Sequence, residues 1–129
     1  MNEHARATYM SASVNTANPH RLLVMLCDRL RLDVQRAIEA QRSGRHQEAG
    51  RQLLHAQDIV LELRSTLHID AWEGGPRLAA IYDWLYAQLV RANVRRDVAI
   101  TEECLHIVDP LVETWREAAL AAAADAQPA

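Results

Sequence analysis

Apolar residues recur along most of the chain at alternating steps of three and four, the spacing that places them on one face of an α-helix. In residues 19–41 the recurring positions are Leu23, Leu26, Leu30, Val34, Ala37 and Gln41. In residues 46–67 they are Ala49, Leu53, Ala56, Val60, Leu63 and Leu67. Both segments are therefore predicted to be helices with one buried side.

Two later segments repeat this pattern. In residues 76–93 one face carries Leu78, Ile81, Tyr82, Leu85, Leu89 and Ala92. A further segment begins near Asp97 and carries Thr101, Cys104, Leu105, Val108, Leu111, Val112 and Trp115. Short links between helices favour antiparallel neighbours, so the predicted fold class is all-α, an antiparallel up-down-up-down four-helix bundle.

Proline and glycine mark where these helices begin and end. Asn18-Pro19 is a typical helix start, and Gly44 is a typical residue just after a helix end. Gly74-Gly75-Pro76 separates the second helix from the third. Pro110 removes a backbone hydrogen bond inside the fourth helix, so we expect a bend there, with a break as the alternative.

The two ends of the chain lack a sustained helical stripe. Residues 1–18 are polar apart from a few side chains such as Tyr9 and Met10, and they are predicted to form a flexible arm or cap. Residues 19–119 are predicted to be the helical bundle. Residues 120–129 are rich in alanine and are predicted to be a disordered tail.

Several apolar residues do not fit the buried stripes. Isolated apolar side chains on a surface are ordinary, but pairs seven residues apart on two helices form a stripe. Such a stripe suits an amphipathic partner helix or a second copy of the chain. The residues predicted to bind a partner are Tyr9, Met10, Met25, Leu32, Leu54, Leu61, Tyr86, Val90, Ile100 and Ile107.

Composition narrows the classes of function. The chain has 129 residues, half of them apolar, and a formal net charge of −3, which suits one globular domain. It has no lysine, and its only tight basic cluster is Arg95-Arg96, so binding to nucleic acid is not expected. No segment is apolar enough for membrane insertion, and no secretion signal follows Met1, so we expect a cytoplasmic protein.

No residues assemble into a recognisable catalytic or metal-binding motif. Glu103 and His106 have the Glu-x-x-His spacing of di-metal bundles, but those sites need two such motifs pointing into the core. Both side chains are expected to point away from the buried stripe here. Cys27 and Cys104 match no metal or redox spacing. We therefore expect no enzyme activity, no metal and no cofactor.

The order of several short motifs resembles the flagellar secretion chaperone family that binds newly made flagellin. In that family a tyrosine precedes Thr-Ala-Ser-Pro and Leu-Ile-x-Met-Leu-Tyr/Phe-Asp-Gly, and here Tyr9 precedes residues 16–29. Further matching positions are residues 56–63, Gly74-Gly75, residues 81–85, Ala92-Asn93, Asp97 and Trp115. The departures from the family pattern are Cys27, Arg29, Pro76, Ala87-Gln88 and Pro110.

The resemblance implies a specific partner and role. It implies that the protein binds the C-terminal segment of flagellin, prevents premature polymerisation and delivers the subunit to a component of the flagellar export gate. It also implies that the region around Tyr9 is a movable cap and a contact for that gate. The alternative is a helical homodimeric adaptor or structural module that does not bind flagellin. A monomer or a weak homodimer is expected.

Overall fold

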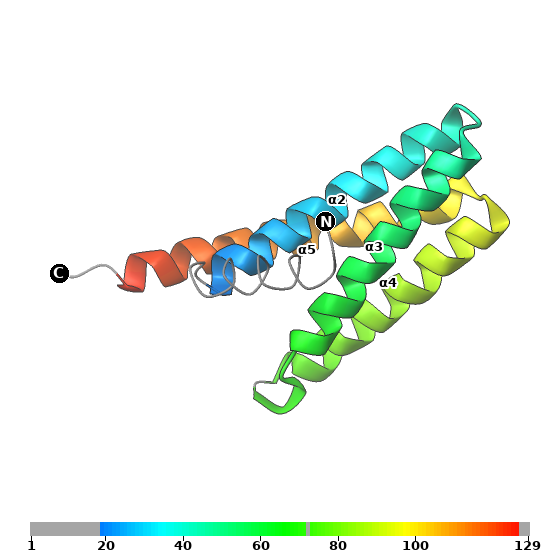
Figure 1. The fold of residues 1–129 in the computed structure, drawn as a ribbon. Helices are drawn as coiled ribbons and strands as arrows, with labels where there is room; N and C mark the ends of the chain where they lie inside the picture. Colours follow the sequence, from blue (N-terminus) through cyan, green and yellow to red (C-terminus); the bar gives the residue numbers. More distant parts are fainter. Residues whose placement is uncertain (1–18, 72, 127–129) are drawn as a thin grey trace, which may run out of the picture.

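The computed structural model describes residues 19–71 and 73–126, and within them the chain is helical with no strand. The helices are α2 (Pro19–Arg42), α3 (His46–Thr66), a 3₁₀ turn η1 (Ile69–Ala71), α4 (Gly75–Arg95) and α5 (Val98–Ala126). The four-helix bundle predicted from the apolar spacing is confirmed (Figure 1). The observed boundaries lie within two residues of the predicted ones, apart from the end of α5.

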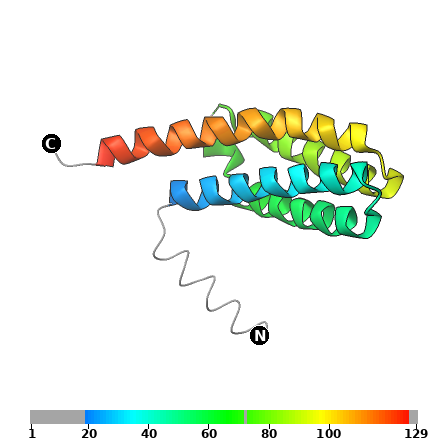
Figure 2. The ribbon, with the colours of Figure 1, turned by 90° about the horizontal axis from the view of Figure 1, so that it is seen from above.

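Each long helix packs against the next one in the chain, and α5 returns to pack against α2. The pairs α2–α5 and α3–α4 lie together at one end of the bundle and diverge toward the other (Figure 1). The last turns of α5 project beyond the other helices in both ribbon views (Figures 1 and 2). The antiparallel ring therefore leaves every helix with one outward side.

The core contains the residues that the spacing predicted to be buried. Its fully buried members include Leu30, Val34, Leu53, Val60, Leu63, Tyr82, Leu85, Leu89, Val108 and Val112. Cys27 and Cys104 are also buried and unpaired. Burial raises the pKa of each thiol to about 12, so both cysteines are neutral at physiological pH.

One charged side chain is buried at the contact between α2 and α3. Asp33 is fully buried, and its carboxylate contacts Nδ1 of His55 on α3. Its second oxygen, Oδ1, lies 3.0 Å from Nε of Arg29, one turn earlier on α2. Because a buried carboxylate without partners is costly, these two half-exposed side chains make its position tolerable.

Two of the links need a left-handed backbone. Gly44 has φ +73°, and the N–H of Arg45 donates to the carbonyl of Ala40 over 2.8 Å, which closes α2. At the end of α4, Arg96 itself adopts φ 51°. Asp97 then accepts a hydrogen bond from the N–H of Ala99 over 3.0 Å and caps the start of α5.

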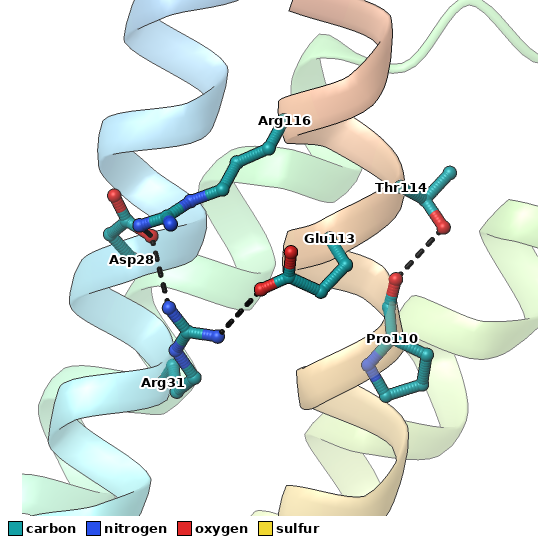
Figure 3. Close-up of polar contacts among 6 residues, drawn as sticks. All are labelled: Asp28, Arg31, Pro110, Glu113, Thr114 and Arg116. Carbon is teal, nitrogen blue, oxygen red and sulfur yellow. Dashed lines mark hydrogen bonds and ion pairs between the residues drawn. The ribbon is translucent and has the colours of Figure 1, made fainter.

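The helix α5 excludes the break considered at Pro110 and corrects the prediction for residues 120–126. It runs without a break through Pro110, whose ring is exposed, and Thr114 Oγ1 donates to the Pro110 carbonyl over 2.8 Å (Figure 3). It also continues to Ala126, so the prediction of a disordered tail is wrong for residues 120–126. Alanine has the highest helix propensity, so a run of it extends a helix that has already begun.

Candidate partner-binding surface

The facing edges of α3 and α4 carry the largest part of the predicted surface. On α3, Gly50 and Arg64 both face α4: a Cβ added to Gly50 would lie 3.2 Å from Oδ1 of Asn93, and Arg64 Nε donates to Oδ1 of Asp83 over 3.1 Å. These two contacts, fourteen residues apart on α3, fix the antiparallel register between the helices. They also identify which edge of each helix faces the other.

Four apolar residues lie on these edges between the two contacts. Leu54 follows Gly50 by one turn, and Leu61 lies seven residues further along the same side of α3. On α4, Tyr86 and Val90 continue the row from Asp83 at steps of three and four. The register places Leu54 about level with Val90, and Leu61 about level with Tyr86. We call these four residues the α3–α4 strip.

The strip is only partly covered by the folded chain. Leu54 is 54% exposed and Leu61 is 48% exposed. Val90 is half-buried, and so is Tyr86, which packs partly against the core. Two leucines that remain half in water on one edge are a favourable surface for an apolar partner, because covering them removes apolar area from water.

Met25 and Leu32 form a separate apolar pair on α2. Met25 is 56% exposed, and Leu32 is half-buried. Arg29 lies between them along the helix and pairs with the buried Asp33, which contacts His55 of α3, so this side of α2 lies next to α3. The outward side of α3 separates the pair from the α3–α4 strip, so the structure does not bring the two groups together.

The remaining predicted residues divide between surface, core and undescribed chain. Ile107 on α5 is exposed. Ile100 is 8% exposed and belongs to the core, so its placement on the exposed stripe is wrong: it lies in the first turn of α5, where the four helices are closest together. Tyr9 and Met10 lie outside the described residues.

Sequence reasoning missed three exposed apolar side chains. Trp84, Val94 and Leu120 are all exposed. Trp84 directly precedes the core residue Leu85, which turns it about 100° away from the buried row, so the spacing was sufficient to identify it. Leu120 was assigned to a disordered tail and was therefore not placed on a helix.

The outward side between α2 and α5 has a different character. Three ion pairs join these helices: Arg31–Glu113 at 3.2 Å, Arg42–Glu102 at 2.7 Å and Arg116–Asp28 at 2.8 Å. Figure 3 shows two of these pairs with the Arg31–Asp28 contact that links them. Such exposed pairs contribute little stability, but each of these arginine, aspartate and glutamate side chains already has a partner within the bundle.

A small pocket opens at the end where the helix pairs diverge. Its volume is about 210 Å³, and its lining comes from α2, α3, η1, α4 and α5. The lining residues are Leu23, Leu63, Thr66, Leu67, His68, Ala71, Leu78, Tyr82 and Trp115. Burial raises the pKa of Tyr82 to about 12, so its hydroxyl stays protonated. The spacing could not predict this pocket, because it assigned most of these residues to a closed core.

The described residues give little basis for other chemistry. Residues 19–71 and 73–126 contain no group of three or more His, Cys, Asp or Glu side chains that could hold a metal ion. Glu103 and His106 are both exposed on α5, as the helical spacing predicted. In the same part of the chain, no helix is long and apolar enough to cross a membrane.

A helical bundle with rows of exposed apolar residues has the form of a protein-binding module. Comparison with known proteins identifies the family to which this module belongs. Residues 1–122 match the model of the family described as flagellar protein FliS, and the chain belongs to this family of flagellar secretion chaperones.

Individual relatives agree with the family match. The flagellar secretion chaperone FliS of Bacillus subtilis is 31% identical over 110 residues, which cover 85% of this chain and 82% of that protein. The protein of the same name from Salmonella typhimurium is 27% identical over 111 residues, covering 84% and 82%. The Vibrio cholerae protein is 26% identical over 110 residues, covering 82% and 79%.

A solved structure supports the fold. A crystal structure described as a flagellar chaperone from bacteria superposes with a TM-score of 0.71 and 22% sequence identity. The match covers 89% of this chain and 94% of the other. At this level of identity the likeness supports the helical bundle and says nothing of which residues bind a partner.

Proposed function

We propose that this chain is a cytoplasmic export chaperone that binds the C-terminal segment of flagellin, prevents its premature polymerisation and delivers it to the flagellar export apparatus. Membership of the FliS family supports a chaperone role in flagellar export. The observation that supports the binding mode is the exposure of Leu54 and Leu61 on one edge of α3, beside Tyr86 and Val90. An amphipathic segment that covers this strip would hide its own apolar side.

The energetics suit a partner that is disordered when free. Coupled folding and binding commonly buries about 1,000–3,000 Å² and costs a few kcal/mol in ordering the segment. Four residues do not supply such an area. The pair Met25–Leu32 on one side, and Trp84 with Ile107 on the other, would extend the contact around the bundle if the segment wraps it.

The export-gate contact is a separate part of the proposal. It is assigned to the N-terminal region around Tyr9 and Met10, which lies outside the described residues. Its support is the match of the family model, which begins at residue 1 and so includes this region.

The proposal is tested by titrating a fluorescently labelled peptide from the C-terminal segment of the same organism's flagellin with the full chain. We expect a saturable rise in anisotropy, and no rise with a shuffled peptide of the same composition. In parallel, equimolar chain should suppress filament growth by purified flagellin. A C-terminal peptide that binds no better than its shuffled form would contradict the proposal.

The homodimeric adaptor stays as a second candidate, because an exposed apolar strip can also pair with its own copy. Light scattering coupled to size exclusion separates the two. A stable dimer that dissociates when Leu61 is replaced by aspartate would favour the adaptor. A monomer that binds the flagellin peptide would favour the chaperone.

A further inference from the structure

An acidic residue lies beside the two leucines of the α3–α4 strip. Asp58 is four residues after Leu54 and three before Leu61, so it shares their side of α3. The register between the helices places it between the levels of Val90 and Tyr86 on α4. At about 100° per residue, Asp58 falls about 40–60° from the two leucines on the side turned away from α4, so its carboxylate lies at the outer rim of the strip.

No basic side chain of the described bundle neutralises Asp58. The carboxylate is exposed, and it makes no ion pair or hydrogen bond with residues 19–71 or 73–126. Arg64, the basic residue that borders the strip on α3, is held by Asp83. Arg51, further toward the start of α3, is already paired, because its guanidinium nitrogen lies 3.3 Å from Oε2 of Glu48. Glu62 adds a second exposed carboxylate one turn beyond Asp58.

We propose that the partner segment presents an arginine or lysine to Asp58, flanked by apolar residues that cover Leu54 and Leu61. This inference rests on the proposed function and names the chemistry of its binding segment. A helix laid over Leu54 and Leu61 passes next to this carboxylate, and an apolar side chain at that point would displace part of its hydration without giving it a partner. A basic side chain gives a charge-assisted hydrogen bond instead.

The arrangement would therefore act as a filter. The four apolar residues favour any amphipathic helix, whereas Asp58 disfavours helices that carry an acidic residue at the facing position. On the exposed surface between α2 and α5, by contrast, Asp28, Glu102 and Glu113 already have arginine partners.

The test uses the full chain and the flagellin C-terminal peptide at low ionic strength. Asp58→Asn keeps the shape of the side chain and removes its charge, and we expect it to weaken binding by about two- to fivefold, as for a pair at the rim of an interface. Asp125→Asn, the same change on the projecting end of α5, is the matched control and should leave the affinity unchanged. Circular dichroism should show the same helicity for all three proteins.

A charge exchange makes the test specific. Asp58→Lys should weaken binding further. In a series of peptides that each have one basic residue replaced by glutamate, one peptide should restore the affinity for this variant. Unchanged affinity of Asp58→Asn, or no rescue by any peptide, would overturn the pairing while leaving flagellin binding in place. If the unaltered chain binds no flagellin peptide, both the proposed function and this inference fail.

Discussion

The α-carbon of Gly75 lies directly against the carbonyl group of Ile69. A Cβ atom built on Gly75 would lie 2.0 Å from the Ile69 oxygen and 2.8 Å from its carbonyl carbon. Both atoms belong to the backbone, so no side-chain rotation could relieve the overlap. Glycine at this position is therefore what allows η1 to fold back against the first turn of α4.

We predict that Gly75→Ala lowers the free energy of unfolding by about 2 kcal/mol or more, because the backbone of η1 must move. Gly44→Ala is the matched control. Gly44 has no atom within 4 Å of an added Cβ, and its cost is limited to the strained φ of +73°, about 1 kcal/mol. Urea denaturation followed by circular dichroism measures both. Equal losses would contradict the steric account.

Pro110 gives a prediction of the opposite sign. It lies inside α5 and cannot donate to the carbonyl of His106, yet the helix is continuous. We expect Pro110→Ala to restore that hydrogen bond and to raise the free energy of unfolding by about 1–3 kcal/mol. A loss of stability in the same urea titration would show that the proline shapes α5 to fit the core.

The buried thiols predict a dependence of stability on pH. The pKa of Cys27 and Cys104 is about 12 in the folded protein, against 9.0 for a free thiol. Above pH 9 the unfolded chain loses these protons while the folded protein keeps them, so stability falls as pH rises from 9 toward 12. In that range each thiol lowers the free energy of unfolding by about 1.4 kcal/mol per pH unit. Below pH 9 it causes no such loss.

Urea denaturation under reducing conditions at pH 8, 9 and 10 measures this slope. The variant with both Cys27→Ala and Cys104→Ala is the control: it should be less stable at every pH but lose less stability between pH 9 and pH 10. The account is wrong if the two proteins lose stability in parallel. Tyr82, whose folded pKa is also about 12, adds to both slopes above pH 10.

The four helices could be predicted from spacing alone, because each has a single row of apolar residues at steps of three and four. It was harder to predict which apolar residues remain exposed. Ile100 and Ile107 are seven residues apart and share a side of α5, yet Ile100 is buried and Ile107 is exposed. The difference comes from how closely the helices approach at each end of the bundle, which helical spacing within one chain does not contain.

Which edges of neighbouring helices face each other could be learned only from the structure. The helical spacing predicted that Met25, Leu32, Leu54 and Leu61 all belong to exposed partner-binding stripes. The fold divides them into two places: Met25 and Leu32 lie beside the α2–α3 contact, and Leu54 and Leu61 lie beside α4. The contacts that show this, Gly50–Asn93 and Arg64–Asp83, join residues far apart in sequence. The importance of Asp58 followed only after this division.

The most direct test of the α3–α4 strip is the affinity of Leu61→Asp for the flagellin C-terminal peptide. We expect a loss of about 2 kcal/mol or more, roughly thirtyfold, with unchanged helicity. Leu120→Asp makes the same change at a residue that is 72% exposed on the projecting end of α5, and it should bind as the unaltered chain does. Wild-type affinity in Leu61→Asp would contradict the assignment of this surface to the partner.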